Sequence, residues 1–354
     1  MVTHRYQAPE PTEDQRAAVE CLAGAERILL TGHERPDGDC LGSQAALARV
    51  LEARGQSAFV MNVDPPDDRY QEVTELATFE VDEGGPLPDH DLVVMLDGGD
   101  LSRTGAMADR LRAAPSRKLV VDHHLHNGSA WWDAAFVDTT ASATGVLVRR
   151  LAYHLEGEVD AGTARALFTT LVTDTGWFKY SNTDQETLLI AAELVAKGVR
   201  PAEVYGDLFQ RAPVNHPRSL AAALARTVFH ADARLAVIDL PLGPDGRSQD
   251  IDGDVALDVL RSVESVEVAL VLREIGPSRC KLSARSKTAF DVQKLASGFG
   301  GGGHAKAAGA TLEVPLVQGR VDIVEAAVEQ LARTQERRSE PRTAADAARQ
   351  KRRA

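Results

Sequence analysis

The sequence has few cysteines, few aromatic residues and no long apolar run. Its three cysteines, Cys21, Cys40 and Cys280, lie far apart, which argues against a disulfide scaffold or a thiolate zinc site. Apolar runs reach only the length of a strand, far short of the roughly 20 residues that a membrane-spanning helix needs. The N-terminus shows no apolar segment typical of a secretory signal. We therefore expect a cytoplasmic protein without a membrane anchor.

Basic charge is also scarce. The 354 residues include 52 acidic and 40 basic side chains, which gives a formal net charge of −12. This acidity argues against a protein that binds long nucleic acid through a basic face, and we expect no specificity for duplex DNA. An anionic substrate is not excluded, because bound metal ions can supply positive charge. The length and the ordinary hydrophobic content favour two globular domains.

Short apolar runs alternate with helical patterns in the first half of the chain. Strands are predicted at 27–31, 57–63, 92–96 and 119–121, and helices at 43–54, 141–155, 161–172, 184–197 and 201–209. Strands that alternate with helices indicate βαβ units. We therefore predict an α/β fold in which a mainly parallel sheet is flanked by helices.

The second half predicts a smaller α/β domain. Its predicted helices are 218–227, 255–263, 292–297 and 321–332, and its predicted strands are 234–240, 266–274, 279–285 and 311–314. A Gly-Pro-Ser turn at 276–278 indicates a hairpin. The predicted organisation is an N-terminal extension at 1–20, a first domain at 21–210, a linker at 211–217, a second domain at 218–333 and a polar tail at 334–354. We expect the tail to be disordered or a solvated helix.

Polar side chains follow several predicted strands, where sites form in open α/β sheets. The candidate metal ligands are His33, Asp37, Asp39, Asp97, His123 and Asp174. Each of them alone is compatible with a turn or a helix cap. Together they supply four carboxylates and two imidazoles, which suit Mn²⁺ or Mg²⁺ better than structural zinc. Six ligands suit two ions that share a bridging carboxylate, a pattern typical of phosphoester hydrolysis.

These motifs, in this order, resemble the DHH phosphoesterase superfamily. The resemblance rests on His-x-x-Pro-Asp-x-Asp at 33–39, the lone Asp97, the Asp-His-His triplet at 122–124 and Asp-Thr-Gly at 174–176. The segments 282–287 and 300–309 resemble the DHHA1 domain of the same proteins. The resemblance covers about 20–333 and is closest, in size and motif order, to the NrnA group of bifunctional oligoribonucleases and 3′-phosphoadenosine-5′-phosphate phosphatases.

The resemblance implies a role for each matching position. His33 and Asp37 would hold one ion. Asp39, His123 and Asp174 would hold the other, and Asp97 would bridge them. His124 would contact the scissile phosphate and help the leaving oxygen depart, while Asp122 would orient an imidazole. The implied substrate contacts are Arg285, Ser286, Gly303, His304 and Arg103. Mn²⁺ is the expected ion, with Mg²⁺ and Co²⁺ as alternatives.

The implied activity is metal-dependent hydrolysis of short oligoribonucleotides and of 3′-phosphoadenosine-5′-phosphate. The expected partners are short single-stranded RNA or small nucleotides. A soluble phosphodiesterase acting on cyclic di-AMP or pApA is the alternative. The glycine run at 300–303 argues against a class II inorganic pyrophosphatase. The intact ligand set argues against a non-catalytic binding protein. The preferred substrate, and whether the protein is a monomer or a homodimer, stay open.

Two further features are a glycine run in the second half of the chain and a cysteine beside a candidate ligand. The glycine run formally matches Gly-x-Gly-x-x-Gly at 298–303, but a helix rather than a strand is predicted before it, so we exclude a dinucleotide-binding fold. Cys40 lies beside Asp39, and we expect it to be a small buried apolar residue. An oxidation-sensitive site is the alternative for this cysteine.

Overall fold

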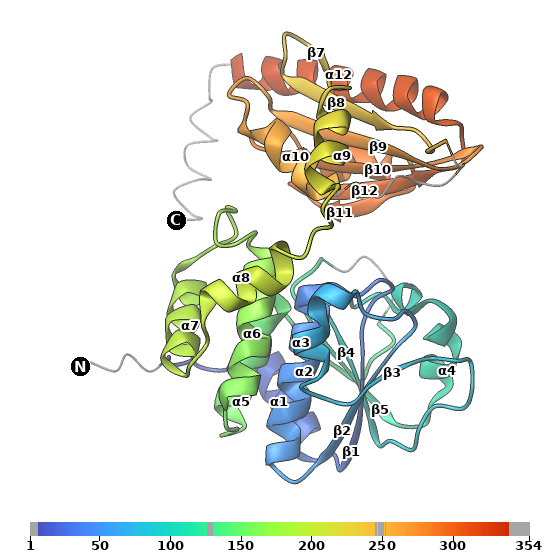
Figure 1. Cartoon of the computed structure of the whole chain (residues 1–354). Helices are drawn as coiled ribbons and strands as arrows, with labels where there is room; N and C mark the ends of the chain where they lie inside the picture. The colour runs from blue at the N-terminus through green and yellow to red at the C-terminus, as the bar shows by residue number, and fades with distance from the viewer. Residues whose placement is uncertain (1–5, 126–129, 245, 247–250, 252, 340–354) are drawn as a thin grey trace. The chain divides into compact units, whose positions relative to one another are not determined.

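The computed structural model describes residues 6–125, 130–244, 246, 251 and 253–339, and it places the side chains as far as residue 334. The chain forms two compact units, of which one ends at Arg211 and the other begins at Ala212. Each unit is built on its own six-stranded sheet (Figure 1).

The sheet of the first unit is parallel throughout, as predicted, with the strand order β3-β2-β1-β4-β5-β6. Its strands are β1 (Arg27–Thr31), β2 (Ser57–Asn62), β3 (Phe79–Val81), β4 (Leu92–Leu96), β5 (Arg117–Asp122) and β6 (Ala134–Val137). The chain builds outward from β1 to β3 and then returns to place β4 on the other side of β1. The strand order therefore reverses between β1 and β4, where open α/β sheets form their sites.

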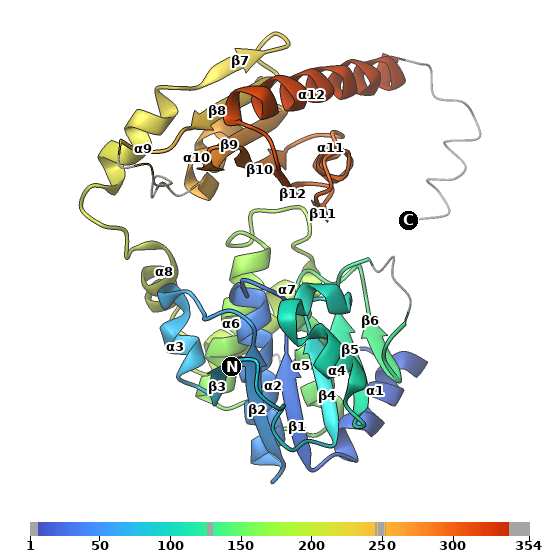
Figure 2. The ribbon, with the colours of Figure 1, turned by 90° about the vertical axis from the view of Figure 1, so that its right-hand side faces the viewer.

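Helices cover both faces of this sheet (Figure 2). They are α1 (Glu13–Ala23), α2 (Gly38–Ala53), α3 (Gln71–Thr74), α4 (Ala108–Ala113), α5 (Thr144–His154), α6 (Ala161–Asp174), α7 (Gln185–Ala196) and α8 (Pro201–Phe209), with 3₁₀ turns η1 (Asp68–Tyr70) and η2 (Leu101–Met107). Successive residues of β1 enter different cores: Leu30 packs with α2, α5 and α6, whereas Leu29 packs with η2 and α4. Both faces are buried, which explains the continuous apolar runs of these strands.

The residues that we assigned to an N-terminal extension belong largely to the first unit. Helix α1 begins after Thr12, whose side chain accepts a hydrogen bond from the backbone of Gln15 and so caps the helix. Ala18 and Leu22 of α1 are fully buried in the main core of the unit. The extension is therefore a packed layer of this fold.

Helix α2 begins at Gly38, five residues before the predicted start. The carboxylate of Asp37 accepts hydrogen bonds from the backbone N–H groups of Asp39 and Cys40, so it is the N-cap. The helix predicted at 43–54 therefore begins one to two turns earlier than its apolar pattern indicated. The two glycines of the first turns obscured the helical pattern, but close packing requires them: a Cβ at Gly42 would lie 2.7 Å from the carbonyl oxygen of Ala166 in α6.

The second unit has a mixed sheet with the order β11-β12-β10-β9-β8-β7, in which β8 and β9 are parallel and the other pairs antiparallel. Its strands are β7 (Val228–His230), β8 (Leu235–Leu240), β9 (Val268–Gly276), β10 (Arg279–Ser286), β11 (Gly302–His304) and β12 (Ala307–Leu312). Its helices are α9 (His216–Leu224), α10 (Gly253–Ser262), α11 (Val292–Ser297) and α12 (Leu316–Ser339). Helices α11 and α12 cover one face, and α9 and α10 the other.

Several predictions for the second unit need correction. The glycine run contains the short strand β11, which pairs with β12 and is too short to show a sequence pattern. The strand predicted at 311–314 begins earlier, at Ala307, because the glycine and alanines there pair with β10. Helix α12 spans Leu316–Ser339 and is longer than the predicted 321–332, so the first residues of the tail form the helix that was one of its two expected states. The tail prediction for 340–354 lies outside the described residues. The hairpin of β9 and β10 and the helix before the glycine run are confirmed.

Among the described residues, no helix combines the length and the apolar character that a membrane crossing needs.

Candidate metal centre

The carboxyl ends of three adjacent strands carry most of the candidate ligands. His33 follows β1, Asp97 follows β4 directly, and His123 follows β5 directly. Because β4 lies between β1 and β5, these side chains meet at one edge of the sheet. Two helices complete the cluster: Asp39 lies in the first turn of α2, and Asp174 is the last residue of α6.

Asp97 lies at the centre of this cluster and is only 2% exposed. One of its carboxylate oxygens lies 3.3 Å from Nε2 of His33, and the other lies 3.6 Å from Nε2 of His123. Burial alone would raise the pKa of Asp97, but the hydrogen bond with His33 and the surrounding imidazoles hold it below its usual range. A carboxylate placed between two imidazoles in this way has the position that a bridging ligand needs.

Asp39 and Asp174 flank the other side of His123. Their carboxylate oxygens lie 3.7 and 3.2 Å from its Nε2. Asp39 is fully buried and accepts hydrogen bonds from the backbone N–H groups of Thr144, at 2.6 Å, and Gly145, at 3.0 Å. These are the first two residues of α5, so the helix N-terminus stabilises the carboxylate.

The imidazoles of His33 and His123 are each oriented by a backbone carbonyl group. Nδ1 of His33 lies 2.8 Å from the carbonyl oxygen of Glu34, and Nδ1 of His123 lies 3.2 Å from that of Ala141. A carbonyl oxygen only accepts hydrogen bonds, so Nδ1 is the donor in each pair. This leaves Nε2 of each ring directed at the carboxylates, the arrangement typical of histidines that bind metals.

The electrostatics of the cluster favour a cation. Burial raises the pKa of Asp39 well above its ordinary value, and the charges of Asp97 and Asp174 raise it further. Burial lowers the pKa of His123, but the hydrogen bond to Asp174 and the charge of Asp39 outweigh it and raise the value to about 11. Carboxylates gathered in this way repel one another unless positive charge neutralises them. The oxygen and imidazole donors therefore fit Mn²⁺ or Mg²⁺.

Asp37 lies at the margin of the cluster. Its Oδ1 is 4.0 Å from Nε2 of His33, and 52% of its side chain is exposed. The same oxygen accepts the two backbone hydrogen bonds that cap α2. The structure thus brings five of the six predicted ligands into close contact and leaves Asp37 at the solvent side.

The Asp-His-His triplet forms a second, adjoining arrangement. Nδ1 of His124 lies 2.7 Å from Oδ1 of Asp122, and the backbone N–H of Gly99 donates to the other oxygen of Asp122 at 2.7 Å. Asp122 is fully buried. Burial alone would raise its pKa, but the hydrogen bond with His124 lowers it. Asp122 therefore holds His124 in one orientation, with Nδ1 engaged.

Arg103 and Cys40 also lie beside the centre. A Cβ at Gly98 would lie 3.2 Å from Nη1 of Arg103, so the guanidinium group packs over the glycine that follows Asp97.

The Cys40 sulfur and one donor atom each of His33 and Asp97 lie within 4.8 Å of one another. Cys40 is fully buried, and burial and the charge of Asp97 raise its pKa well above the ordinary value. Such a thiol behaves as a small apolar group.

Sequence reasoning missed two residues that support the cluster. The Thr144 hydroxyl donates to Asp97 at 3.0 Å. The Asn182 side-chain amide donates to the backbone carbonyls of Ser142, at 3.0 Å, and Asp174, at 3.1 Å. Neither side chain titrates or binds a metal strongly, so neither stands out in a sequence. The one available signal was the predicted helix N-terminus near Thr144, which suits an anion.

The substrate contacts predicted from the DHHA1 resemblance lie in the second unit. Arg285 on β10 donates to Asp254 at 2.7 Å. The Ser286 hydroxyl is buried and donates to the carbonyl oxygen of Phe290 at 2.8 Å, so it holds the turn after β10. Gly303 on β11 has a φ of 132°, and a Cβ there would lie 2.5 Å from the carbonyl oxygen of Ala307. His304, the next residue, is exposed.

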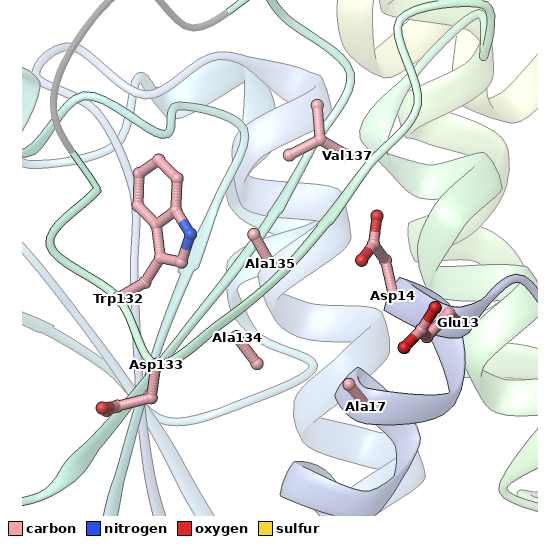
Figure 3. Close-up of a pocket in the computed structure, with 8 residues that line it drawn as sticks. All are labelled: Glu13, Asp14, Ala17, Trp132, Asp133, Ala134, Ala135 and Val137. Carbon is pink, nitrogen blue, oxygen red and sulfur yellow. The ribbon is translucent and has the colours of Figure 1, made fainter.

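A surface pocket lies elsewhere, between α1 and the edge strand β6 (Figure 3). Its lining residues are Glu13, Asp14, Ala17, Trp132, Asp133, Ala134, Ala135 and Val137. Neither the imidazoles nor the carboxylates of the cluster belong to it. Its acidic lining offers no attraction for a phosphate group.

Comparison with known proteins agrees with the motifs. Residues 27–173 match the DHH family, N-terminal domain, and residues 236–334 match the DHHA1 domain. The bifunctional oligoribonuclease and PAP phosphatase NrnA of Thermus thermophilus is 34% identical over 92% of this chain and 98% of its own length. The cyclic-di-AMP phosphodiesterase GdpP of Bacillus subtilis is 24% identical over 81% of this chain but only 45% of its own.

A solved structure has a similar fold. An exopolyphosphatase-related protein from Bacteroides fragilis is 25% identical, with a TM-score of 0.80 over 90% of this chain and 96% of the other. The motifs stand in the expected order, and the relative from Thermus thermophilus is matched over nearly its full length. The chain therefore belongs to the DHH family of phosphoesterases and carries the DHHA1 domain after the catalytic one.

Proposed function

We propose that this phosphoesterase hydrolyses short oligoribonucleotides and removes a phosphate from 3′-phosphoadenosine-5′-phosphate with the help of two divalent ions. The observation that carries the proposal is the position of Asp97 between His33 and His123, with oxygen-to-nitrogen distances of 3.3 and 3.6 Å. The relative with the matching activities in its name covers nearly the whole chain.

The ligands divide into two groups around the shared carboxylate. His33 and Asp37 would hold one ion, Asp39, His123 and Asp174 the other, and Asp97 would bind both. When bound, the ions would neutralise charge on the phosphate oxygens and lower the pKa of a water molecule towards neutrality. Mn²⁺ is the ion that this mixture of carboxylates and imidazoles suits best, and Mg²⁺ and Co²⁺ are the alternatives.

The chain itself supplies the group that serves the leaving oxygen. Asp122 engages Nδ1 of His124 at 2.7 Å, so Nε2 of His124 is the nitrogen that can face a substrate. We propose that Nε2 of His124 donates a proton to the departing oxygen. Arg103, whose guanidinium packs over Gly98, would contact the phosphate.

The second unit would bind the remainder of the substrate. Arg285 and His304 offer positive or hydrogen-bonding groups, and the backbone N–H groups of the glycine run suit an anion. Ser286 would act indirectly, because its hydroxyl already donates to Phe290. The expected partners are short single-stranded RNA and small nucleotides. The three described cysteines are free and buried, which is compatible with the expected cytoplasmic location.

The test is a parallel turnover assay in Mn²⁺ with pApA, a 5-mer RNA, 3′-phosphoadenosine-5′-phosphate, cyclic di-AMP and pyrophosphate. We expect turnover of the RNA, pApA and 3′-phosphoadenosine-5′-phosphate. Preference for cyclic di-AMP would favour the alternative that the more distant relative suggests. Turnover of pyrophosphate alone, or of no substrate, would refute the proposal.

A further inference from the structure

The segment 138–144, which leads into α5, contacts the metal centre without containing a candidate ligand. Its last residue, Thr144, donates its backbone N–H to Asp39 at 2.6 Å and its hydroxyl to Asp97 at 3.0 Å. One residue of this segment thus orients two carboxylates of the cluster. We call residues 138–144 the orienting segment.

The same segment also orients the imidazole of His123 and is linked through Asn182 to the end of α6. The carbonyl oxygen of Ala141 accepts from Nδ1 of His123 at 3.2 Å. The carbonyl oxygen of Ser142 accepts from Asn182, which also donates to the backbone carbonyl of Asp174. The orientation of several candidate ligands therefore depends on where this segment lies.

Asp138 fixes the start of the orienting segment. Its Oδ1 accepts the backbone N–H of Thr140 at 3.0 Å and the Thr140 hydroxyl at 2.6 Å. Its Oδ2 accepts Nη1 of Arg150 at 2.7 Å. Its backbone N–H donates to the carbonyl oxygen of Asp122 at the end of β5. The turn that carries Ala141 is thus tied to both the sheet and α5.

Arg150 links this turn to two distant parts of the first unit. Its Nε and Nη2 donate to the two carboxylate oxygens of Glu186 on α7, at 2.9 and 2.5 Å. The hydroxyl of Tyr6, near the N-terminus, donates to the same carboxylate at 2.5 Å. The Arg150 side chain is only 11% exposed. A planar guanidinium engaged at both edges cannot rotate without losing hydrogen bonds.

We propose that Arg150 is a positioning residue of the metal centre. Together with Glu186 and Tyr6 it holds Asp138, and through Asp138 it fixes the orienting segment. This inference rests on the proposed function, because it concerns the same metal centre. Groups that orient metal ligands typically contribute about 10- to 100-fold to metal affinity or activity.

The neighbouring residue offers a matched control. Arg149, also on α5, donates through Nε and Nη2 to Glu193 on α7 at 2.9 and 2.8 Å. This pair is more deeply buried than that of Arg150 and Glu186, with side chains 6% and 9% exposed against 11% and 21%. Its hydrogen bonds to Glu193 do not reach the orienting segment, although its guanidinium lies 4.9 Å from the centroid of the Tyr6 ring. Removing it tests the loss of a buried ion pair between the same two helices.

The experiment compares the metal-free wild-type chain with the variants Arg150→Met, Arg150→Lys and Arg149→Met. Mn²⁺ affinity is measured by calorimetry, thermal stability by circular dichroism, and kcat and KM on pApA. We expect both methionine variants to melt at lower temperature. We expect Mn²⁺ affinity and kcat to fall about tenfold or more only in Arg150→Met. Lysine at this position should restore part of the affinity, because it can still donate to Asp138.

Two results would overturn the inference. One is wild-type Mn²⁺ affinity in Arg150→Met, and the other is an equal loss of affinity in Arg149→Met. If Arg150→Met does not fold, Thr140→Val at an exposed position removes one hydrogen bond of Asp138, and unchanged Mn²⁺ affinity there also overturns it. Failure of the wild-type chain to bind Mn²⁺ would instead refute the proposed function.

Discussion

Asp97 adopts a backbone conformation that is unusual for a residue other than glycine, with a φ of 60°. Such a left-handed residue costs of the order of 1 kcal/mol and persists where the surroundings hold it. Its backbone N–H donates to the carbonyl oxygen of Val121 on β5, and its carboxylate lies between two imidazoles. The strained turn at the end of β4 therefore directs this carboxylate into the cluster.

The role of Asp97 can be tested with Asp97→Asn. Asparagine tolerates the left-handed conformation, so the fold should be retained while the bridging charge is lost. We expect the loss of nearly all Mn²⁺-dependent turnover on pApA, with little change in the circular dichroism spectrum. Turnover at the wild-type rate would contradict the shared-ligand assignment.

If His124 is a proton donor, its substitution should lower kcat without weakening Mn²⁺ binding. In His124→Gln the ring that Asp122 orients is lost, but the carboxylates and imidazoles of the cluster remain. We expect kcat to fall by about 10²- to 10⁴-fold while Mn²⁺ affinity, measured by calorimetry, stays near that of the wild type. Loss of metal binding in this variant would show that His124 is a ligand rather than a proton donor.

At the scale of elements, the distance between α2 and α6 sets the distance between two candidate ligands. Asp39 lies in α2 and Asp174 at the end of α6, and these helices pack closely. The approach depends on Gly42, because a Cβ there would lie 2.7 Å from the carbonyl oxygen of Ala166. A backbone atom cannot yield to a new methyl group without moving the helix.

Gly42→Ala should therefore separate α2 from α6. Overpacking costs about 1–3 kcal/mol, which outweighs the helix propensity of about 0.5–1 kcal/mol that alanine adds. We expect a lower free energy of unfolding in urea and weaker Mn²⁺ binding. The control is Gly206→Ala in α8, where the new Cβ would have only an ordinary contact with Gln210. Equal stability changes in the two variants would contradict this account.

At the scale of the whole molecule, each unit has its own hydrophobic core. The candidate metal ligands belong to the first unit alone. We therefore expect two unfolding transitions in calorimetry. Mn²⁺ should raise the transition temperature of the first unit alone, and a chelator should reverse this increase. At a hundredfold excess over the dissociation constant, binding should add about 2.7 kcal/mol to that unit. An equal shift of both transitions would contradict a metal centre confined to the first unit.

Substitutions of the proposed substrate contacts in the second unit should affect substrate binding alone. In Arg285→Ala and His304→Ala we expect KM for pApA to rise at least about tenfold, since each would remove a proposed hydrogen bond to a charged group of the substrate. Mn²⁺ content and affinity should be unchanged. If KM and kcat both keep their wild-type values in both variants, these residues do not bind the substrate.

Local patterns predicted the elements that depend on their own residues. The bounds of β1 and α11 match the prediction, because an uninterrupted apolar run and a capped helical pattern mark them. The start of α2 was missed, because glycines in its first turns mask a helix whose cap is Asp37. The edge strands β3, β6, β7 and β11 have only three or four residues and depend on the neighbour that each one pairs with.

The sequence by itself determined the fold class, the strand ends that carry acidic and imidazole groups, and the chemistry that those groups favour. These follow from residue type and local spacing, which are present before the chain folds. Only the tertiary structure decided which groups orient the ligands. The carbonyl oxygen of Ala141, the two donors of Thr144 and the link through Arg150 act by their position in space. Backbone groups look alike at every position of a sequence, so only packing reveals which of them reach the metal centre.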